Sequence, residues 1–202
     1  MGNYLVIGGS SGIGLSIVQQ LADSGNHVWA TYNQHPVENV AGIHYFPLDI
    51  MSDSLSLDIP DILDGLVYCP GKINLKPFAR IDEKDFILDY QIQVLGAVKV
   101  IKAVLPNLKK SQQSSIVLFS TVAVQTGFNF HSLVASSKGA LEGLTKALAA
   151  EFAPAIRVNA IAPSITQTPL ADPLLNTPEK KEANANRHPL KRIGMPQDIA
   201  DA

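Results

Sequence analysis

A glycine-rich segment lies close to the start of the chain, at residues 8–14 (GGSSGIG). It follows an apolar run and precedes a segment in which Ile13, Ile17 and Leu21 recur at helical spacing. Glycines at such a junction let the backbone turn tightly and approach a phosphate, and the following helix offers free N–H groups. The segment therefore predicts a nucleotide site, with a purely structural turn as the alternative. Its expected contacts are Gly8, Ser10, Ser11, Gly12, Ile13 and Gly14.

Short apolar runs alternate along the chain with longer segments of helical period, and these elements must position the glycine-rich segment. Such alternation is typical of βαβ units. Strands are predicted over residues 4–9, 27–32, 43–48, 66–69, 116–120 and 156–162, and helices over 13–24, 82–108 and 132–152. We therefore expect one α/β domain over residues 1–202, a doubly wound, Rossmann-like parallel sheet with a cofactor across the carboxyl ends of its strands. The polar, proline-rich residues 166–190 are predicted to carry short helices and to cover a substrate.

The composition restricts the classes of partner. Hydrophobic residues make up 46% of the chain and charged residues 17%, and the net charge of −2 leaves no basic patch for nucleic acid. Cys69 is the only cysteine, which excludes an internal disulfide and a cysteine-built metal centre, and no metal site is predicted. Neither an apolar run of about 18 residues nor a leader segment is evident, so we expect a cytoplasmic protein without a membrane partner.

Further motifs accompany the spacing of Gly8, Gly12 and Gly14. They are Asp49-Ile50, Arg157-Val158-Asn159 followed by Pro163, Thr168, and residues 192–196 (RIGMP). Together they resemble the short-chain dehydrogenase/reductase family over residues 4–202. The resemblance implies a nicotinamide dinucleotide cofactor, whose remaining contacts would be Asp49, Ile50, Gly71, Lys138, Pro163, Ile165 and Thr168. It also leads us to expect that the family's final helix and last strand are missing from this sequence.

The catalytic positions depart from the family pattern, which is a tetrad of Asn, Ser, Tyr and Lys. Residues 136–140 (SSKGA) set the register and make Lys138 the lysine. By that register Val134 stands at the tyrosine position, Thr121 at the serine position and Gln93 at the asparagine position. Thr121 retains a hydroxyl and Gln93 an amide, but valine has no proton to give. The resemblance implies that Lys138 contacts the nicotinamide ribose without a phenol beside it.

His131 is a candidate for the missing acid. It lies three residues before Val134, so it would share that helix face one turn earlier, and an imidazole with a pKa of about 6.5 can donate a proton. The alternative is a histidine that caps or packs at the helix entrance. Tyr90 stands in the same relation to Gln93. Cys69 is interpreted as a small core residue rather than a nucleophile.

The end of the second predicted strand bears on cofactor choice. Residues 31–35 (TYNQH) contain no carboxylate, which would bind a ribose diol and repel a 2′-phosphate. Thr31 and Asn33 are neutral donors that tolerate the phosphate, so NADP(H) is expected to be preferred over NAD(H).

Two functional hypotheses follow. The first is an oxidoreductase of the short-chain type that acts on an unidentified small-molecule carbonyl or alcohol. The alternative is a non-catalytic, NADP(H)-binding regulatory protein on the same fold, because function depends on the site rather than the fold. Small residues along 132–152, with the helix over 82–108, predict a homodimer or homotetramer; packing of those residues on the chain's own sheet is the alternative.

Overall fold

A six-stranded parallel sheet forms the centre of the computed structural model, which describes residues 1–34 and 36–202. Its strand order is β3-β2-β1-β4-β5-β6. The strands are β1 (Asn3–Ile7), β2 (His27–Tyr32), β3 (Ile43–Pro47), β4 (Gly65–Tyr68), β5 (Ser114–Phe119) and β6 (Ile156–Ile161). The predicted single-domain α/β fold is confirmed, and the predicted strands agree with these bounds to within two residues.

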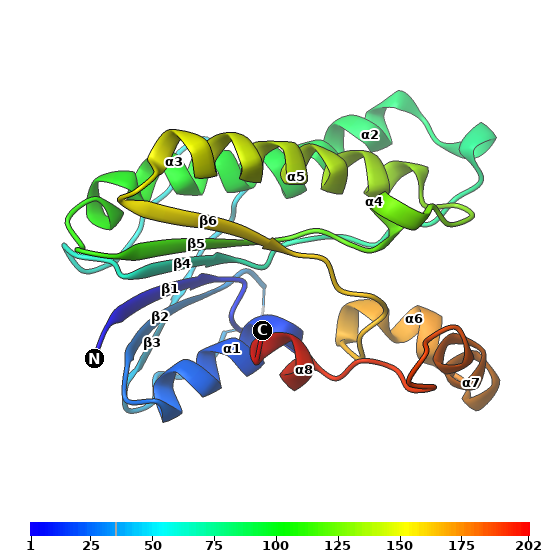
Figure 1. The fold of residues 1–202 in the computed structure, drawn as a ribbon, viewed down its shortest axis with the longest axis horizontal. Coiled ribbons are helices and arrows are strands. Elements are labelled where there is room, and N and C mark those ends of the chain that lie inside the picture. Colours follow the sequence, from blue (N-terminus) through cyan, green and yellow to red (C-terminus); the bar gives the residue numbers. More distant parts are fainter. Residues whose placement is uncertain (35) are drawn as a thin grey trace.

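Helices cover both faces of this sheet (Figure 1). On one face lie α1 (Gly12–Asp23) and α8 (Pro196–Ala200), and on the other lie α3 (Gly96–Leu108) and α5 (Ser132–Phe152). Side chains alternate along a strand, so Leu5 and Ile7 of β1 join the core under α3 and α5, while Val6 joins Val18 of α1. Strands buried on both faces explain the continuous apolar runs of the sequence.

The strand order reverses between β1 and β4, and this reversal places the candidate site. Connections leave these neighbouring strands toward opposite faces, so a crevice opens at their carboxyl ends, where ligands bind in this class of sheet. The loop of residues 8–14 follows β1, and residues 69–71 follow β4. Beyond β5 lie Thr121 and a short helix that the sequence analysis missed, α4 (Ala123–Thr126).

The helix predicted over residues 82–108 has three consecutive parts. They are α2 (Glu83–Tyr90), a π-helical turn η2 (Gln91–Leu95) and α3, and the backbone stays helical across both junctions. Hydrophobic periodicity averages over several turns, so it does not reveal one wider turn. Such π turns are frequent at functional sites.

The segment between β6 and α8 is folded into short helices, as its prolines and polar residues predicted. These are η3 (Pro169–Ala171), α6 (Asp172–Leu175) and α7 (Pro178–Asn186); an earlier short turn is η1 (Phe78–Arg80). Figure 1 shows α6 and α7 beyond the carboxyl end of β6. That this segment covers a substrate remains a prediction.

Candidate functional site

The loop after β1 has the backbone geometry of a phosphate cradle. Gly8 (φ +74°) and Gly12 (φ +53°) adopt the left-handed region that favours glycine. A Cβ on Gly14 would lie 2.2 Å from the carbonyl oxygen of Gly8, so only glycine lets α1 begin this close to the loop. The backbone N–H of Gly8 donates to Oγ1 of Thr31 at 3.0 Å, which ties the loop to β2.

The N-terminus of α1 directly follows this loop, at Gly12. Ser11 is its exposed N-cap residue, and its side chain makes no capping hydrogen bond among the described residues. Backbone N–H groups of the first turn are therefore available to an anion. Thr168 also reaches this point, because a Cβ on Gly12 would lie 3.2 Å from its Cγ2. Two predicted cofactor segments, 8–14 and Thr168, thus come together.

The residues predicted for the adenosine half lie at the ends of β2 and β3. Thr31 is buried and its hydroxyl accepts the loop hydrogen bond described above, so it shapes the loop. Asn33 is exposed directly after β2, while His35 lies outside the described residues. Asp49 is exposed, with Oδ1 accepting a hydrogen bond of 2.9 Å from the backbone two residues on, and Ile50 is buried beside it.

Two polar side chains meet beside Gly71, just after β4. A Cβ on Gly71 would lie 3.5 Å from Oε1 of Gln93 and 3.6 Å from Nζ of Lys138. Both side chains are buried, with 0% of Gln93 and 8% of Lys138 exposed. Oε1 of Gln93 has no hydrogen-bond partner within the described part of the chain. A buried acceptor left this way costs about 1–3 kcal/mol, so the arrangement fits a ligand or water that donates a hydrogen bond there.

Asp89 is a third buried polar residue of this site, and the sequence analysis missed it. It lies in α2 with 2% of its surface exposed, and its Oδ2 accepts a hydrogen bond of 2.7 Å from Nε2 of Gln93. Its Oδ1 has no partner in residues 1–34 and 36–202. The signal that could have revealed it is its place four residues before Gln93, which puts both side chains on one helix face.

Burial dominates the electrostatics of the cluster. It lowers the pKa of Lys138 to about 8, and the negative charge of Asp89 opposes that change. Burial also raises the pKa of the Cys69 thiol to about 12, against the effect of the Lys138 charge. Cys69 is thus a neutral thiol at pH 7, which makes it a poor nucleophile.

Tyr68 holds the π-helical turn that carries Gln93. Its buried hydroxyl donates a hydrogen bond of 2.6 Å to the carbonyl oxygen of Ile92, and burial raises the pKa of the phenol. A Cβ on Gly96 would lie 2.2 Å from that hydroxyl, so glycine is needed for Tyr68 to reach the helix. The contact gives a partner to a backbone carbonyl of a turn that departs from the regular α-helix.

Thr121 and Val134 lie just after β5 and at the start of α5. Thr121 follows β5, is half-buried, and its Oγ1 accepts a 3.3 Å hydrogen bond from the backbone of Ala123 while its hydroxyl hydrogen stays available. Val134 lies in the first turn of α5 with 7% of its surface exposed. Four residues separate it from Lys138, about 6 Å along the helix axis.

His131 is the N-cap residue of α5, about 10 Å along the axis from Lys138. Its Nδ1 lies 2.8 Å from the carbonyl oxygen of Asn129, and its ring packs edge-on against Phe128 at 5.4 Å. Because a carbonyl oxygen only accepts, Nδ1 is the protonated nitrogen and Nε2 is the free position. Tyr90 is 42% exposed.

The exit of β6 is held by backbone hydrogen bonds. The carbonyl oxygen of Pro163 accepts from the N–H of Val122 at 3.2 Å, and that of Ile165 accepts from Gly194 at 3.2 Å. These bonds place the segment that leads to Thr168 beside the end of β5.

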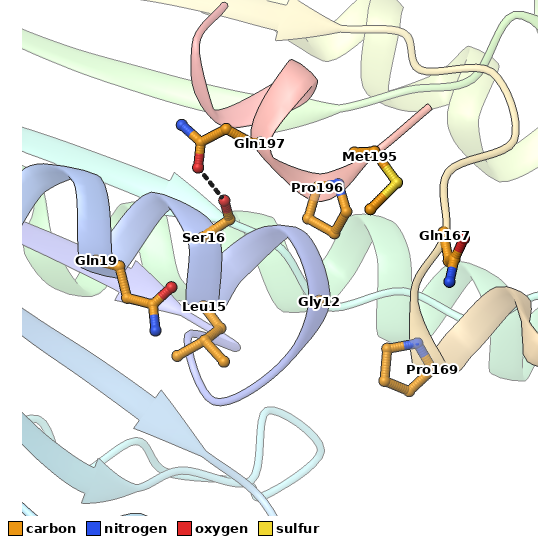
Figure 2. A pocket seen from close by; sticks show the side chains of 9 residues that line it. All are labelled: Gly12, Leu15, Ser16, Gln19, Gln167, Pro169, Met195, Pro196 and Gln197. Carbon is orange, nitrogen blue, oxygen red and sulfur yellow. Dashed lines mark hydrogen bonds between the residues drawn. The ribbon is translucent and has the colours of Figure 1, made fainter. Parts of the chain in front are cut away.

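A pocket of about 390 Å³ adjoins the outer side of the phosphate loop (Figure 2). It lies between the first turns of α1 and the segment that enters α8, where Oγ of Ser16 donates to Oε1 of Gln197 at 3.0 Å. Its lining carries no ionisable side chain: Gly12, Leu15, Ser16, Gln19, Gln167, Pro169, Met195, Pro196 and Gln197. The lining of this pocket therefore offers no side chain for acid–base chemistry.

No helix in residues 1–34 and 36–202 combines the length and the apolar character needed to cross a membrane. Over the same ranges, no three His, Cys, Asp or Glu side chains gather in a way that could hold a metal ion.

The chain is similar in sequence to several known oxidoreductases. A family model described as enoyl-(acyl carrier protein) reductase matches residues 8–202. A tropinone reductase homolog of Arabidopsis thaliana is 33% identical over 214 residues, covering 97% of this chain and 70% of that protein. L-xylulose reductase of Bos taurus is 30% identical over 207 residues, covering 98% of this chain and 85% of that protein.

Solved structures show the same fold. Ligand-free aldohexose dehydrogenase of Thermoplasma acidophilum superimposes with a TM-score of 0.88 at 25% identity, over 99% of this chain and 84% of the other. ElxO with NADP bound gives a TM-score of 0.87 at 25% identity, over 100% of this chain and 89% of the other.

Proposed function

The chain belongs to the short-chain dehydrogenase/reductase family, and from this premise we propose that it is an NAD(P)-dependent oxidoreductase that interconverts a carbonyl and an alcohol in a small-molecule substrate. Its relatives include an L-xylulose reductase, and the similar ElxO structure has NADP bound. Both support the proposed reaction class and cofactor class.

The observation that carries the proposal is the polar cluster at the crevice between β1 and β4. Lys138 and Gln93 are buried there beside Gly71, close to the loop that can cradle phosphates. Burying an ammonium costs free energy unless a partner compensates it, so such a residue is a candidate for function. A bound dinucleotide supplies two groups that fit, phosphates for the N-terminus of α1 and ribose hydroxyls for Lys138 and Gln93.

A nicotinamide bound at this site would supply the hydride chemistry, which leaves the proton to the chain's own residues. In the reducing direction the alcohol oxygen needs a proton from a group within hydrogen-bond reach. Val134 has none to give. We propose that the Thr121 hydroxyl polarises the carbonyl and that Nε2 of His131, or a water held near Gln93, delivers the proton.

Two finer features belong to the same proposal. NADP(H) is the proposed cofactor, because the end of β2 carries Asn33 rather than a carboxylate that would repel a 2′-phosphate. A homodimer or homotetramer in the cytoplasm is the proposed state. Small exposed residues support the oligomer, since Ser136, Gly143 and Ala147 share one face of α5.

Calorimetric titration with NADPH and NADH, followed by a turnover screen across aldehydes, ketones and secondary alcohols, tests the function. Gly14→Ala should abolish dinucleotide binding, because its Cβ would lie 2.2 Å from a backbone oxygen. Gly143→Ala is the matched control, because a Cβ there meets nothing within 4 Å. Binding with turnover supports the proposal; binding without turnover supports the regulatory alternative, and no binding refutes both.

A further inference from the structure

We propose that Asp89 is a positioning residue of this site, whose carboxylate anchors the amide of Gln93 and supplies the countercharge that keeps Lys138 in its ammonium form. The effect of Asp89 on dinucleotide binding rests on the function proposed above. The arrangement itself is a property of the cofactor-free chain.

Three buried side chains from two packed helical segments make up the cluster. Asp89 and Gln93 are joined by the 2.7 Å hydrogen bond, and Gln93 and Lys138 face the same point beside Gly71. The fractions exposed are 2% for Asp89, 0% for Gln93 and 8% for Lys138, so bulk water compensates none of them well. Burying a carboxylate or an ammonium costs free energy unless an opposite charge or a hydrogen bond compensates it.

The hydrogen bond gives Gln93 a direction. A carboxylate only accepts, so the NH₂ group of Gln93 is the end that points to Asp89 and Oε1 is the end that points toward Gly71. An unanchored amide could present either end. With Asp89 in place, the site shows a ligand one fixed acceptor, Oε1, and one fixed donor, the Lys138 ammonium.

The charge of Asp89 gives Lys138 its protonation state. Burial alone drives the lysine toward its neutral form, and a nearby negative charge favours the ammonium. Among the described residues, the ionisable groups that act on Lys138 are Asp89 of α2 and Cys69 after β4. Cys69 is a neutral thiol at pH 7, so Asp89 is the group whose charge counts there.

The test is a pH titration of the Lys138 side chain by NMR in protein grown with ¹³Cε-labelled lysine, without cofactor. Lys138→Met identifies the signal by removing it. The wild-type midpoint should lie near pH 8. Asp89→Asn keeps an acceptor for Gln93 but removes the charge, and should lower that midpoint by about 1 pH unit or more. Asp85→Asn, a neutralised carboxylate one turn earlier in α2 that pairs with Lys76, should leave it unchanged.

Two outcomes would contradict the role proposed for Asp89. A Lys138 midpoint in Asp89→Asn equal to that of the wild type would overturn the proposal, and so would an equal fall in Asp85→Asn. Should Asp89→Asn fail to fold, the smaller neutral variant Asp89→Ser is titrated in the same way. Failure to bind any dinucleotide with the midpoint shift intact would refute the proposed function and leave the role of Asp89 standing.

Discussion

At the scale of single residues, the proposed site combines a loop whose backbone suits a pyrophosphate with a helix start that carries no proton donor at Val134. Gly8, Gly12 and Gly14 keep the loop geometry that a pyrophosphate needs. Val134, in contrast, is a buried aliphatic side chain one helical turn before Lys138, at the position where the sequence predicts the family's proton donor to stand. Removing a general acid slows proton transfer without removing hydride transfer, so weak activity is the expected state of this chain.

Restoring a phenol should raise the rate of carbonyl reduction. Val134→Tyr places a hydroxyl one turn before Lys138, and a positioned general acid is worth about 10²- to 10⁴-fold. An increase in kcat of at least about tenfold with NADPH and a generic aldehyde is the expected result. Val134→Phe is the matched control, since it adds the same ring without the hydroxyl. Equal rates for the two variants would show that ring volume, not the proton, is responsible.

His131→Ala should abolish the native activity if Nε2 of His131 delivers the proton. The substitution removes the only ring nitrogen proposed to hand a proton to the substrate oxygen. His131→Gln, which keeps a polar group at the helix entrance, should be equally inactive. Turnover that survives both substitutions with an unchanged pH profile would eliminate the histidine.

Lys138 should make cofactor affinity depend on pH. Its pKa is lowered to about 8, so the lysine is an ammonium below that pH and neutral above it. The affinity for NADP(H) should therefore be highest below pH 8 and fall as pH rises toward 10. Isothermal titrations across this range measure the change, and Lys138→Met should bind weakly with a flat profile. A wild-type affinity independent of pH would contradict this role.

At the scale of elements, the π-helical turn within the long helix determines where Gln93 points. The Tyr68 hydroxyl stabilises this wider turn by donating a hydrogen bond to the Ile92 carbonyl oxygen. Gly96 has no side chain that would clash with that hydroxyl. A strand residue thus sets the geometry of a helix residue in the site.

Tyr68→Phe should destabilise the protein and loosen Gln93. The Ile92 carbonyl loses its hydrogen bond, a loss worth about 1–3 kcal/mol in the free energy of unfolding. Gly96→Ala should cost stability too, because its Cβ would lie 2.2 Å from the hydroxyl. In the double variant that clash is relieved. The double variant should therefore lose less free energy of unfolding than the sum of the losses in the two single variants. Urea unfolding measures all three variants, and strict additivity would refute the contact.

At the scale of the whole molecule, the exposed faces of the long helices suggest how copies would assemble. Ser136, Gly143 and Ala147 form a stripe of small residues on α5. Ile87 and Leu95, from α2 and the π-helical turn, are 58% and 46% exposed. Small side chains permit close helix approach, and exposed apolar side chains gain by burial.

Ala147→Arg should therefore dissociate the oligomer. Because Ala147 is exposed, the substitution should not disturb the fold of one chain. Sedimentation velocity at micromolar concentration should show a dimer or tetramer for the wild type and a monomer for this variant. Ala183→Arg, also exposed but on α7, should sediment like the wild type. A monomeric wild type would contradict the predicted assembly.

The sequence by itself determined the sheet, its strands and the glycine loop. Those features depend on the periodicity of apolar residues and on the backbone freedom of glycine, and both are determined by residues close together in the sequence. That Val134 stands at the position of the catalytic tyrosine stays a prediction, made by counting back four residues from Lys138.

Only the tertiary structure decided what surrounds Lys138. From the sequence, Asp89 is expected to be an ordinary helix carboxylate. In the structure α2 packs against α5, and Asp89 is buried. From the sequence, Tyr68 is expected only to be a core aromatic residue; the structure shows that its hydroxyl donates a hydrogen bond to the Ile92 carbonyl oxygen. The role of Tyr68 arises from a contact between residues 24 positions apart, which no local pattern encodes. The four-residue spacing of Asp89 and Gln93 indicates a shared helix face, but the burial of Asp89 depends on another helix. The same holds for Thr31, whose hydroxyl is directed to the phosphate loop because β1 and β2 pair in parallel.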